Sequence, residues 1–248
     1  FFCFCAAASS AYIINDLLDL PGDRDHPRKR RRPFAAGDVP VSHGLVLSAV
    51  LMAMALGASM VLPPRFIMIL CTYVVATLAY SLFLKRKVIV DVIVLGGLYT
   101  LRVFAGLAAA TTQTSQWLLM FSLFLFLSLA IVKRCSELEV RRAAGKTATM
   151  GRGYRVGDLS VLFPLAAAAG YGAVFVVALY LSSPDVVGLY AHPRRMWLVC
   201  PLVLYWISRV IVLSNRGELH DDPVIFAITD RVSWLTGVCV AGVIAVSI

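Results

Sequence analysis

The sequence predicts an all-α protein, a polytopic bundle of transmembrane helices that forms one domain over residues 1–248. Hydrophobic residues make up 60% of the chain and the mean hydropathy is +0.82, whereas the apolar share of a soluble domain is typically about 45 to 50%. Apolar runs also recur at the length of about 20 residues that a helix needs to cross a bilayer. Because the chain opens inside such a run, we expect that an upstream helix is missing.

Eight apolar segments are candidate spans, and turn signals such as Pro63-Pro64 and Ser183-Pro184 separate several of them. In order along the chain they are residues 1–20, 41–62, 66–84, 88–110, 117–132, 159–182, 196–214 and 232–248. Five of the six cysteines fall in these segments, at spacings typical of neither disulfides nor zinc sites. We therefore expect the cysteines to be core or lipid-facing residues.

Basic residues are distributed unevenly between the connections. Of the 23 Lys and Arg residues, eighteen lie in four alternate connections, which begin at Pro21, Lys85, Lys133 and Asn215. Cytoplasmic loops of membrane proteins are enriched in Lys and Arg, so these connections are expected on the cytoplasmic side of a bacterial-type inner or plasma membrane, where an active site would open. The net charge of +9 then reflects topology and phosphate binding rather than nucleic-acid binding.

An acidic cluster follows the first apolar segment. Asp16, Asp19 and Asp23 lie three and four residues apart, a spacing that places side chains on one side of a helix. At about 6 Å and an effective dielectric constant near 20, each adjacent pair of carboxylates repels by about 3 kcal/mol, so we expect bound cations. Oxygen ligands alone favour Mg²⁺. Pro21 should kink or end the helix near Leu20, with Asp23 on the following turn.

A basic loop comes directly after this cluster, at residues 24–32. Arg28 and Lys29 are expected to bind the phosphate or pyrophosphate that usually accompanies Mg²⁺. A simpler interpretation stays open, in which Arg24, Arg28 and Lys29 neutralise the three aspartates through salt bridges at the membrane surface.

The next basic connection contributes further candidates for phosphate binding. Tyr80, Lys85 and Arg86 lie where the third expected span ends, although the two basic residues also suit a simple topology anchor. Arg102 lies about three turns inside its expected span, where a lipid-facing charge costs at least about 2.5 kcal/mol. It should therefore face the bundle interior, with Asp91 or a bound anion as its partner.

The third basic connection is expected to be a flexible loop that begins at Lys133 and wraps a metal-bound phosphate. Its candidate phosphate-binding residues are Lys133, Arg134, Tyr154 and Arg155, and its candidate ligands of a second metal are Glu137 and Asp158. A solvated amphipathic connector is the alternative. In the last connection, Asp222 before Pro223 favours the start of a short interfacial helix over a ligand role for residues 218–222.

The first motif resembles a known family. Asn15-Asp16-x-x-Asp19-x-x-x-Asp23 with Arg24-x-His26-Pro27-x-Lys29-Arg30-x-Arg32-Pro33 is similar to the first aspartate-rich motif of the UbiA superfamily of intramembrane prenyltransferases. The resemblance implies a single, N-terminally truncated transferase domain with eight of nine helices present and the first one missing. It also implies that Mg²⁺ and the pyrophosphate of a donor bind the aspartate-rich regions, with Asn15, Asp16, Asp19 and Asp23 as catalytic residues.

Two departures from the aromatic prenyltransferases narrow the resemblance. Between Lys133 and Asp158 there is no Asp-x-x-x-Asp pair, and Tyr80 and Lys85 are one residue further apart than in a Tyr-x-x-x-Lys motif. Other motifs are instead similar to the decaprenyl-phosphate phosphoribosyltransferase branch: Tyr80-Ser81-Leu82-x-Leu84-Lys85, Asp91, Arg102-x-x-Ala105-Gly106 and Lys133-Arg134-x-x-Glu137-Leu138.

This branch implies transfer of 5-phosphoribosyl from phosphoribosyl pyrophosphate to a polyprenyl phosphate, with release of pyrophosphate. Mg²⁺ with Lys85, Lys133, Arg134 and Arg155 would neutralise the leaving group. One alternative is an aromatic prenyltransferase that transfers the chain of a polyprenyl diphosphate to an acceptor such as 4-hydroxybenzoate. Another is a transporter or lipid-binding membrane protein in which the acidic cluster is an ion site.

Overall fold

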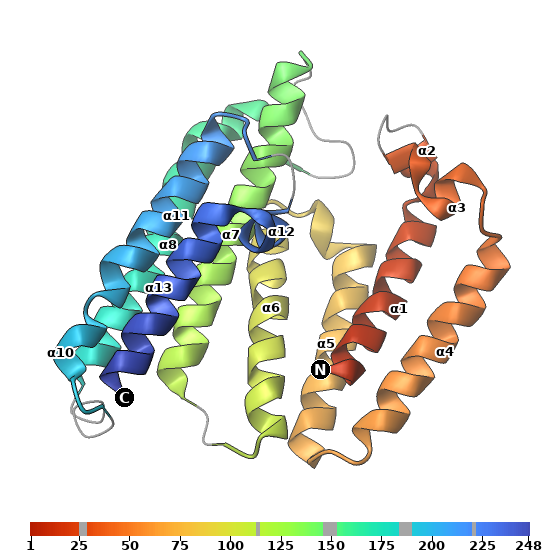
Figure 1. The fold of residues 1–248 in the computed structure, drawn as a ribbon. Helices are drawn as coiled ribbons and strands as arrows, with labels where there is room; N and C mark the ends of the chain where they lie inside the picture. Colours follow the sequence, from red (N-terminus) through yellow and green to blue (C-terminus); the bar gives the residue numbers. More distant parts are fainter. Residues whose placement is uncertain (25–28, 113–114, 146–152, 184–189, 220–221) are drawn as a thin grey trace. The chain divides into compact units, whose positions relative to one another are not determined.

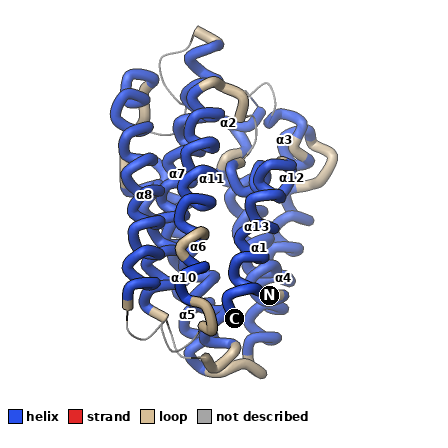
Figure 2. Tube along the Cα trace, turned by 60° about the vertical axis from the view of Figure 1, so that its left-hand side comes forward, coloured by secondary structure: helices blue, strands red, loops and turns tan. Residues whose placement is uncertain are grey.

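The computed structural model describes residues 1–24, 29–112, 115–145, 153–183, 190–219 and 222–248 (Figure 1). Within these ranges every regular element is a helix and none is a strand, which confirms the predicted all-α class (Figure 2). The helices group into two compact units. The first unit holds α1 to α5 with both ends of α6, and the second holds the middle of α6, Leu95–Thr100, with α7 to α13.

Six helices of the described residues are long and apolar enough to cross a membrane. They are α4 (Val41–Ser59), α5 (Pro64–Leu82), α6 (Val90–Ala109), α7 (Gln116–Ala143), α8 (Leu159–Ser182, preceded by η3, Val156–Asp158) and α11 (Val199–Asn215, preceded by α10, Pro193–Met196). A seventh span is formed if α12 (Pro223–Thr229) and α13 (Arg231–Ser247), bent by 77° at their junction, count as one. The apolar α1 (Phe2–Leu18) is shorter, at 17 residues. Each of the eight expected segments thus contains a helix, but by length and composition fewer than eight qualify as spans.

The first unit is built around α1, which packs along α4 and α5. Small side chains on α1 allow this close approach, among them Ala6 and Ala7, which are buried with Ala55 of α4 and Leu70 of α5. The Ser10 hydroxyl donates to the Ser48 carbonyl oxygen at 2.8 Å and joins α1 to α4 within the core. This packing holds the end of α1, where the acidic cluster lies, in a defined position.

The chain changes direction just after α1. The helix ends at Leu18, and α2 (Leu20–Arg24) follows, because Pro21 has no N–H to continue the helical ladder. The Asp19 N–H still donates to the Asn15 carbonyl and the Asp23 N–H to the Asp19 carbonyl, both at 2.9 Å, so helical spacing persists across the break. The predicted break near Leu20 is confirmed, but Asp23 lies on the short helix α2 rather than on a turn.

In the second unit, α7 packs against α8 and α11. We expected this span to end at Val132 and a flexible loop to begin at Lys133, and that prediction was wrong because α7 continues to Ala143. Residues 133–143 contain neither glycine nor proline, and the Arg134–Glu137 and Glu139–Arg142 ion pairs form at helical spacing. Lys133, Arg134 and Glu137 are therefore carried by a rigid helix.

Helices α12 and α13 each begin with an aspartate that caps the helix. Asp222 accepts a hydrogen bond from the Val224 N–H at 2.9 Å, which confirms the predicted cap. Asp230 accepts one from the Ser233 N–H at 2.7 Å and also binds Arg209 of α11 through two hydrogen bonds of 2.7 and 3.1 Å. Side-chain hydrogen bonds thus hold both ends of α12.

The contact between α6 and α7 generates a stability prediction. A Cβ at Gly96 would lie 3.0 Å from the Leu127 backbone nitrogen, whereas at Gly97 no atom of the described residues lies within 4 Å. Gly96→Ala should destabilise the protein by about 1 to 3 kcal/mol through overpacking against backbone. Gly97→Ala should be neutral or stabilising, since alanine is the better helix former by about 1 kcal/mol. Thermal unfolding of the purified variants in detergent measures both, and equal shifts would contradict the close approach.

Candidate active site

Two aspartates of the predicted cluster converge on one cation. Arg32 Nη1 donates to Asp16 Oδ1 at 2.7 Å and to Asp23 Oδ2 at 2.8 Å. Asp16 belongs to α1 and Asp23 to α2, so the break between these helices turns the two carboxylates toward a common point. The Asp23 residue is only 4% exposed, and its charge is therefore neutralised within the protein rather than by bulk solvent.

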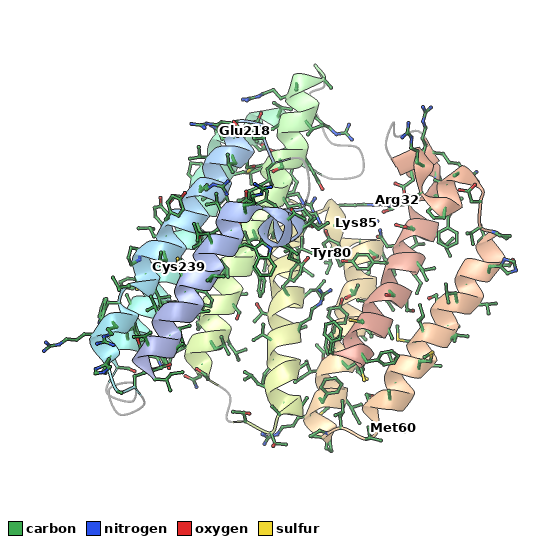
Figure 3. All side chains as sticks on the ribbon, viewed as in Figure 1. Arg32, Met60, Tyr80, Lys85, Glu218 and Cys239 are labelled. Atoms are coloured by element: carbon green, nitrogen blue, oxygen red, sulfur yellow. The ribbon has the colours of Figure 1, made fainter. Side chains whose placement is uncertain are left out.

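The third aspartate is held by a lysine from much further along the chain. Lys85 Nζ donates to both carboxylate oxygens of Asp19, at 2.6 and 2.8 Å, and to Asn15 Oδ1 at 3.1 Å. Asn15 Nδ2 in turn donates to Asp19 Oδ2 at 3.2 Å. Lys85 lies in η2 (Leu84–Arg86), directly after α5, and is 8% exposed. Arg32 and Lys85 both come from the end of the first unit that carries the cluster (Figure 3).

Arg32 and Lys85, the cations described here, are not among the three that the simpler interpretation of the sequence named. Arg24 is exposed, Arg28 lies outside the described residues, and Lys29 is the first residue of η1 (Lys29–Arg31). Arg32, which sequence reasoning missed as a site residue, precedes Pro33 at the start of α3 (Pro33–Ala36). A residue before proline is restricted to extended backbone, as its φ of −66° and ψ of 144° show. The position before Pro33 was the signal in the sequence that the backbone at Arg32 is extended.

The donor set is of the kind that Mg²⁺ prefers: carboxylate oxygens with the Asn15 amide oxygen nearby. Within the part of the chain that the structure describes, no three His, Cys, Asp or Glu side chains are already grouped as metal ligands. Arg32 and Lys85 pair with the three aspartates in this structure. Since the Asp16 and Asp23 oxygens already face a single positively charged nitrogen, the residues fit a cation, and a metal would have to exchange with these side chains.

The first unit also holds the candidates Tyr80, Arg86 and Arg102. Arg102 donates to the Tyr73 hydroxyl at 2.7 Å, with its guanidinium 5.3 Å from the centre of that ring, a partner that the sequence did not suggest. Asp91, the expected partner, is fully buried near the start of α6. Tyr80 is half-buried on α5 and Arg86 is exposed in η2. Their roles in phosphate binding stay predictions.

The candidates in the second unit form ion pairs of their own. Lys133 donates to Asp222 Oδ2, and Arg134 Nη1 donates to Glu137 Oε2 at 2.5 Å. Glu139, which sequence reasoning did not single out, is buried and pairs with Arg142 at 2.6 Å. The predicted roles of Glu137 in metal binding and of Lys133 and Arg134 in phosphate binding are untested by these contacts.

Three further candidates lie around η3. Asp158 Oδ2 accepts from the Arg155 N–H at 2.8 Å and so caps this short helix, while Tyr154 is buried and Arg155 exposed. The Asp158 carboxylate thus has a local structural role, and a second-metal role for it stays a prediction, as do the phosphate-binding roles of its two neighbours.

A bundle of apolar helices, with acidic and basic side chains paired where the first helix breaks, defines the class of the protein as a polytopic helical membrane protein. More particularly, the chain belongs to the UbiA prenyltransferase family, whose model matches residues 1–244. Membership confirms the predicted transferase class at the level of the family.

Three relatives illustrate the similarity. The chain is 39% identical over 245 residues to an uncharacterised protein, y4nM, of Sinorhizobium fredii, and spans 97% of itself but 47% of that relative, about half its length. It is 35% identical to the nodulation protein NoeC of Azorhizobium caulinodans, over 98% of the chain and 78% of the relative. It is 30% identical to the decaprenyl-phosphate phosphoribosyltransferase of Mycobacterium tuberculosis, over 95% of the chain and 76% of the relative.

Solved structures share the fold. A UbiA homologue from Archaeoglobus fulgidus, determined with DMAPP and Mg²⁺, superposes with a TM-score of 0.72 at 17% identity and covers 99% of this chain and 86% of its own. A digeranylgeranylglyceryl phosphate synthase superposes with a TM-score of 0.64 at 16% identity, over 98% and 80% of the two chains. The predicted helical membrane fold is thus confirmed.

The Arg32 bridge generates a prediction about metal binding. In Arg32→Ala the carboxylates of Asp16 and Asp23 lose their shared cation, so added Mg²⁺ should stabilise this variant more than the wild type, by up to about 2.7 kcal/mol when Mg²⁺ is at 100 times its Kd. Thermal unfolding with and without Mg²⁺ provides the measurement. Arg31→Ala, which removes an exposed neighbouring charge, is the matched control. Equal responses of the two variants to Mg²⁺ would argue against a cation site at the bridge.

Proposed function

We propose that this UbiA-family protein is a Mg²⁺-dependent transferase that moves 5-phosphoribosyl from phosphoribosyl pyrophosphate to a polyprenyl phosphate. The convergence of Asp16 and Asp23 on one cation supports the proposal most directly, because carboxylate oxygens that share a cation are also suitable ligands for a divalent ion. The similarity to decaprenyl-phosphate phosphoribosyltransferases, together with the motifs shared with that branch, supports the choice of donor and acceptor.

The residues that would hold Mg²⁺ are Asp16, Asp19 and Asp23, with Asn15 beside them. When bound, the metal supplies charge neutralisation for the departing pyrophosphate. Arg32 and Lys85, which pair with these carboxylates, would also bind phosphate. Lys85 and Arg32 lie within hydrogen-bonding distance of the acidic cluster, so after exchange with the metal their N–H groups are available to phosphate oxygens at the same place.

The proposed reaction needs no strong general base. The bond between the ribosyl anomeric carbon and the pyrophosphate oxygen breaks, and a bond forms from that carbon to an oxygen of the polyprenyl phosphate. The acceptor is already an anion, so no proton has to be removed from it. What the protein must supply is positive charge around the leaving group. Arg134 and Arg155 of the second unit are further candidates for this role.

The membrane setting follows from the same assignment. The apolar helices would keep the polyprenyl chain in the bilayer, and the bias of Lys and Arg toward alternate connections supports a site that opens to the cytoplasm. A soluble sugar phosphate donor is then available from the aqueous phase while the acceptor stays anchored in lipid.

Transfer of label tests the proposal. Membranes or purified protein with Mg²⁺, polyprenyl phosphate and labelled phosphoribosyl pyrophosphate should yield a labelled lipid. Asp16→Asn should lower the rate by at least about 100-fold, since the site loses charge that neutralisation of the leaving group requires. Asp38→Asn, at an exposed aspartate beyond α3, should retain the wild-type rate.

Two results would contradict this function. One is an active preparation that transfers no label from phosphoribosyl pyrophosphate but prenylates an aromatic acceptor from a polyprenyl diphosphate. The other is Asp16→Asn with undiminished transfer of phosphoribosyl, which would place the metal and the chemistry elsewhere.

A further inference from the structure

The arginine that bridges two aspartates of the acidic cluster lies in a short, hydrogen-bonded segment around α3. The Ala36 N–H donates to the Arg32 carbonyl at 2.8 Å, and the Asp38 N–H donates to the Pro33 carbonyl at 3.0 Å. Gly37 ends α3 with a φ of 87°, in the left-handed region that glycine adopts without strain. Since Pro33 also has a fixed φ, a displacement within this segment is readily transmitted to the backbone of Arg32.

Phe34 docks this segment onto the helices of the first unit. A Cβ at Gly44 would lie 2.7 Å from Cε1 and 2.9 Å from Cζ of Phe34, and 3.4 Å from Cδ1 of Leu17. Gly44 is buried near the start of α4, and Leu17 directly follows Asp16 on α1. The tip of the ring therefore lies against the bare backbone of α4, next to the turn of α1 that carries Asp16, and Figure 1 shows α3 near the ends of both helices.

This contact explains why α4 has a glycine at Gly44. Glycine is an unfavourable residue within a helix, because it loses more backbone entropy on folding than alanine does. Any larger residue there would displace the Phe34 ring. Gly57, on the same helix, is exposed, and no atom of the described residues lies within 4 Å of its Cβ position. Phe34 and Gly44 thus fit each other, and Gly57 supplies a control on the same helix.

The Arg32 side chain needs such support, because it is long and still 38% exposed. A flexible guanidinium that reaches two carboxylates through one nitrogen loses much rotamer freedom, and a well-placed backbone reduces that loss. Hydrogen bonds of 2.7 and 2.8 Å to Asp16 and Asp23 place the nitrogen evenly between them. We propose that Phe34 is a positioning residue: its ring, seated against Gly44, holds Arg32 between the two aspartates and so sets the Mg²⁺ concentration at which the metal replaces the guanidinium.

This role of Phe34 rests on the proposed function, in which Mg²⁺ binds together with pyrophosphate. A well-placed Arg32 competes with bare Mg²⁺ for the carboxylates, whereas phosphate oxygens that accompany the metal give the guanidinium another partner nearby. Arg32 in this position therefore favours the metal–diphosphate complex over the free metal. Displacement of Phe34 weakens both effects, which separates a positioning role from a general loosening of the fold.

Titration with Mg²⁺ alone tests the proposal on the full chain in nanodiscs. The readout is the midpoint, the Mg²⁺ concentration that gives half of the maximal rise in unfolding temperature. Arg32→Ala should lower this midpoint about tenfold, the equivalent of one charge-assisted hydrogen bond. Phe34→Ala and Gly44→Ala should lower it about threefold or more, because a displaced Arg32 competes less well with the metal. Gly57→Ala should keep the wild-type midpoint.

Two double variants show whether Phe34 acts through Arg32. Arg32→Ala with Phe34→Ala should match Arg32→Ala alone, since no guanidinium is left to position. Phe34→Leu with Gly44→Ala should return toward the wild-type midpoint, because leucine lacks the ring atoms that an alanine Cβ would meet. Added inorganic pyrophosphate should lower the midpoint more in the wild type than in Phe34→Ala.

Wild-type midpoints in Phe34→Ala and Gly44→Ala, beside a shifted midpoint in Arg32→Ala, would overturn the proposal. Additive shifts in the double variant of Phe34 and Arg32 would do the same, because the ring would then act on the cluster independently of the guanidinium. An unshifted midpoint in Arg32→Ala would instead count against the metal site and the proposed function, and would remove this role of Phe34 with them. Since these measurements involve no turnover of substrate, the two failures are distinguishable.

Discussion

Electrostatic neutralisation of three neighbouring carboxylates is the constraint on which the first unit depends. Asp16, Asp19 and Asp23 follow one another at helical spacing, and without cations their repulsion would oppose the helical ladder that carries them. Two basic side chains from different parts of the chain neutralise the three carboxylates. Arg32 returns from the connection after α2, and Lys85 arrives from the end of α5. The connection after α2 and the end of α5 thus each supply a basic side chain that neutralises the aspartates.

In the proposed function, the side chains that pair with the aspartates would also bind the phosphate of a metal-bound substrate. A guanidinium bridging two carboxylates and an ammonium on a third are good partners for phosphate oxygens. Exchange of a divalent ion for these cations would conserve the local charge while freeing both donors. In the second unit, Asp222 pairs with Lys133 in the same way.

Much of the fold was predictable from hydrophobic runs and from proline. The apolar segments contain the helices, Pro21 breaks the first of them, and the Asp222-Pro223 pair starts α12. The far end of α7 was not predictable, because hydropathy falls after Val132 while the helix continues to Ala143 with ion pairs at helical spacing. Arg32 was missed for a different reason: its place before Pro33 indicates an extended backbone, but its pairing with Asp16 and Asp23 depends on tertiary packing.

The most direct test of the central claim is the position of the metal itself. Anomalous scattering from crystals grown with Mn²⁺ and a diphosphate would locate it. The account predicts a Mn²⁺ peak between the carboxylates of Asp16 and Asp23, with the Arg32 guanidinium moved from that point onto a phosphate oxygen. A structure with saturating Mn²⁺ and diphosphate in which Arg32 still bridges both aspartates, and the metal lies elsewhere, would contradict it.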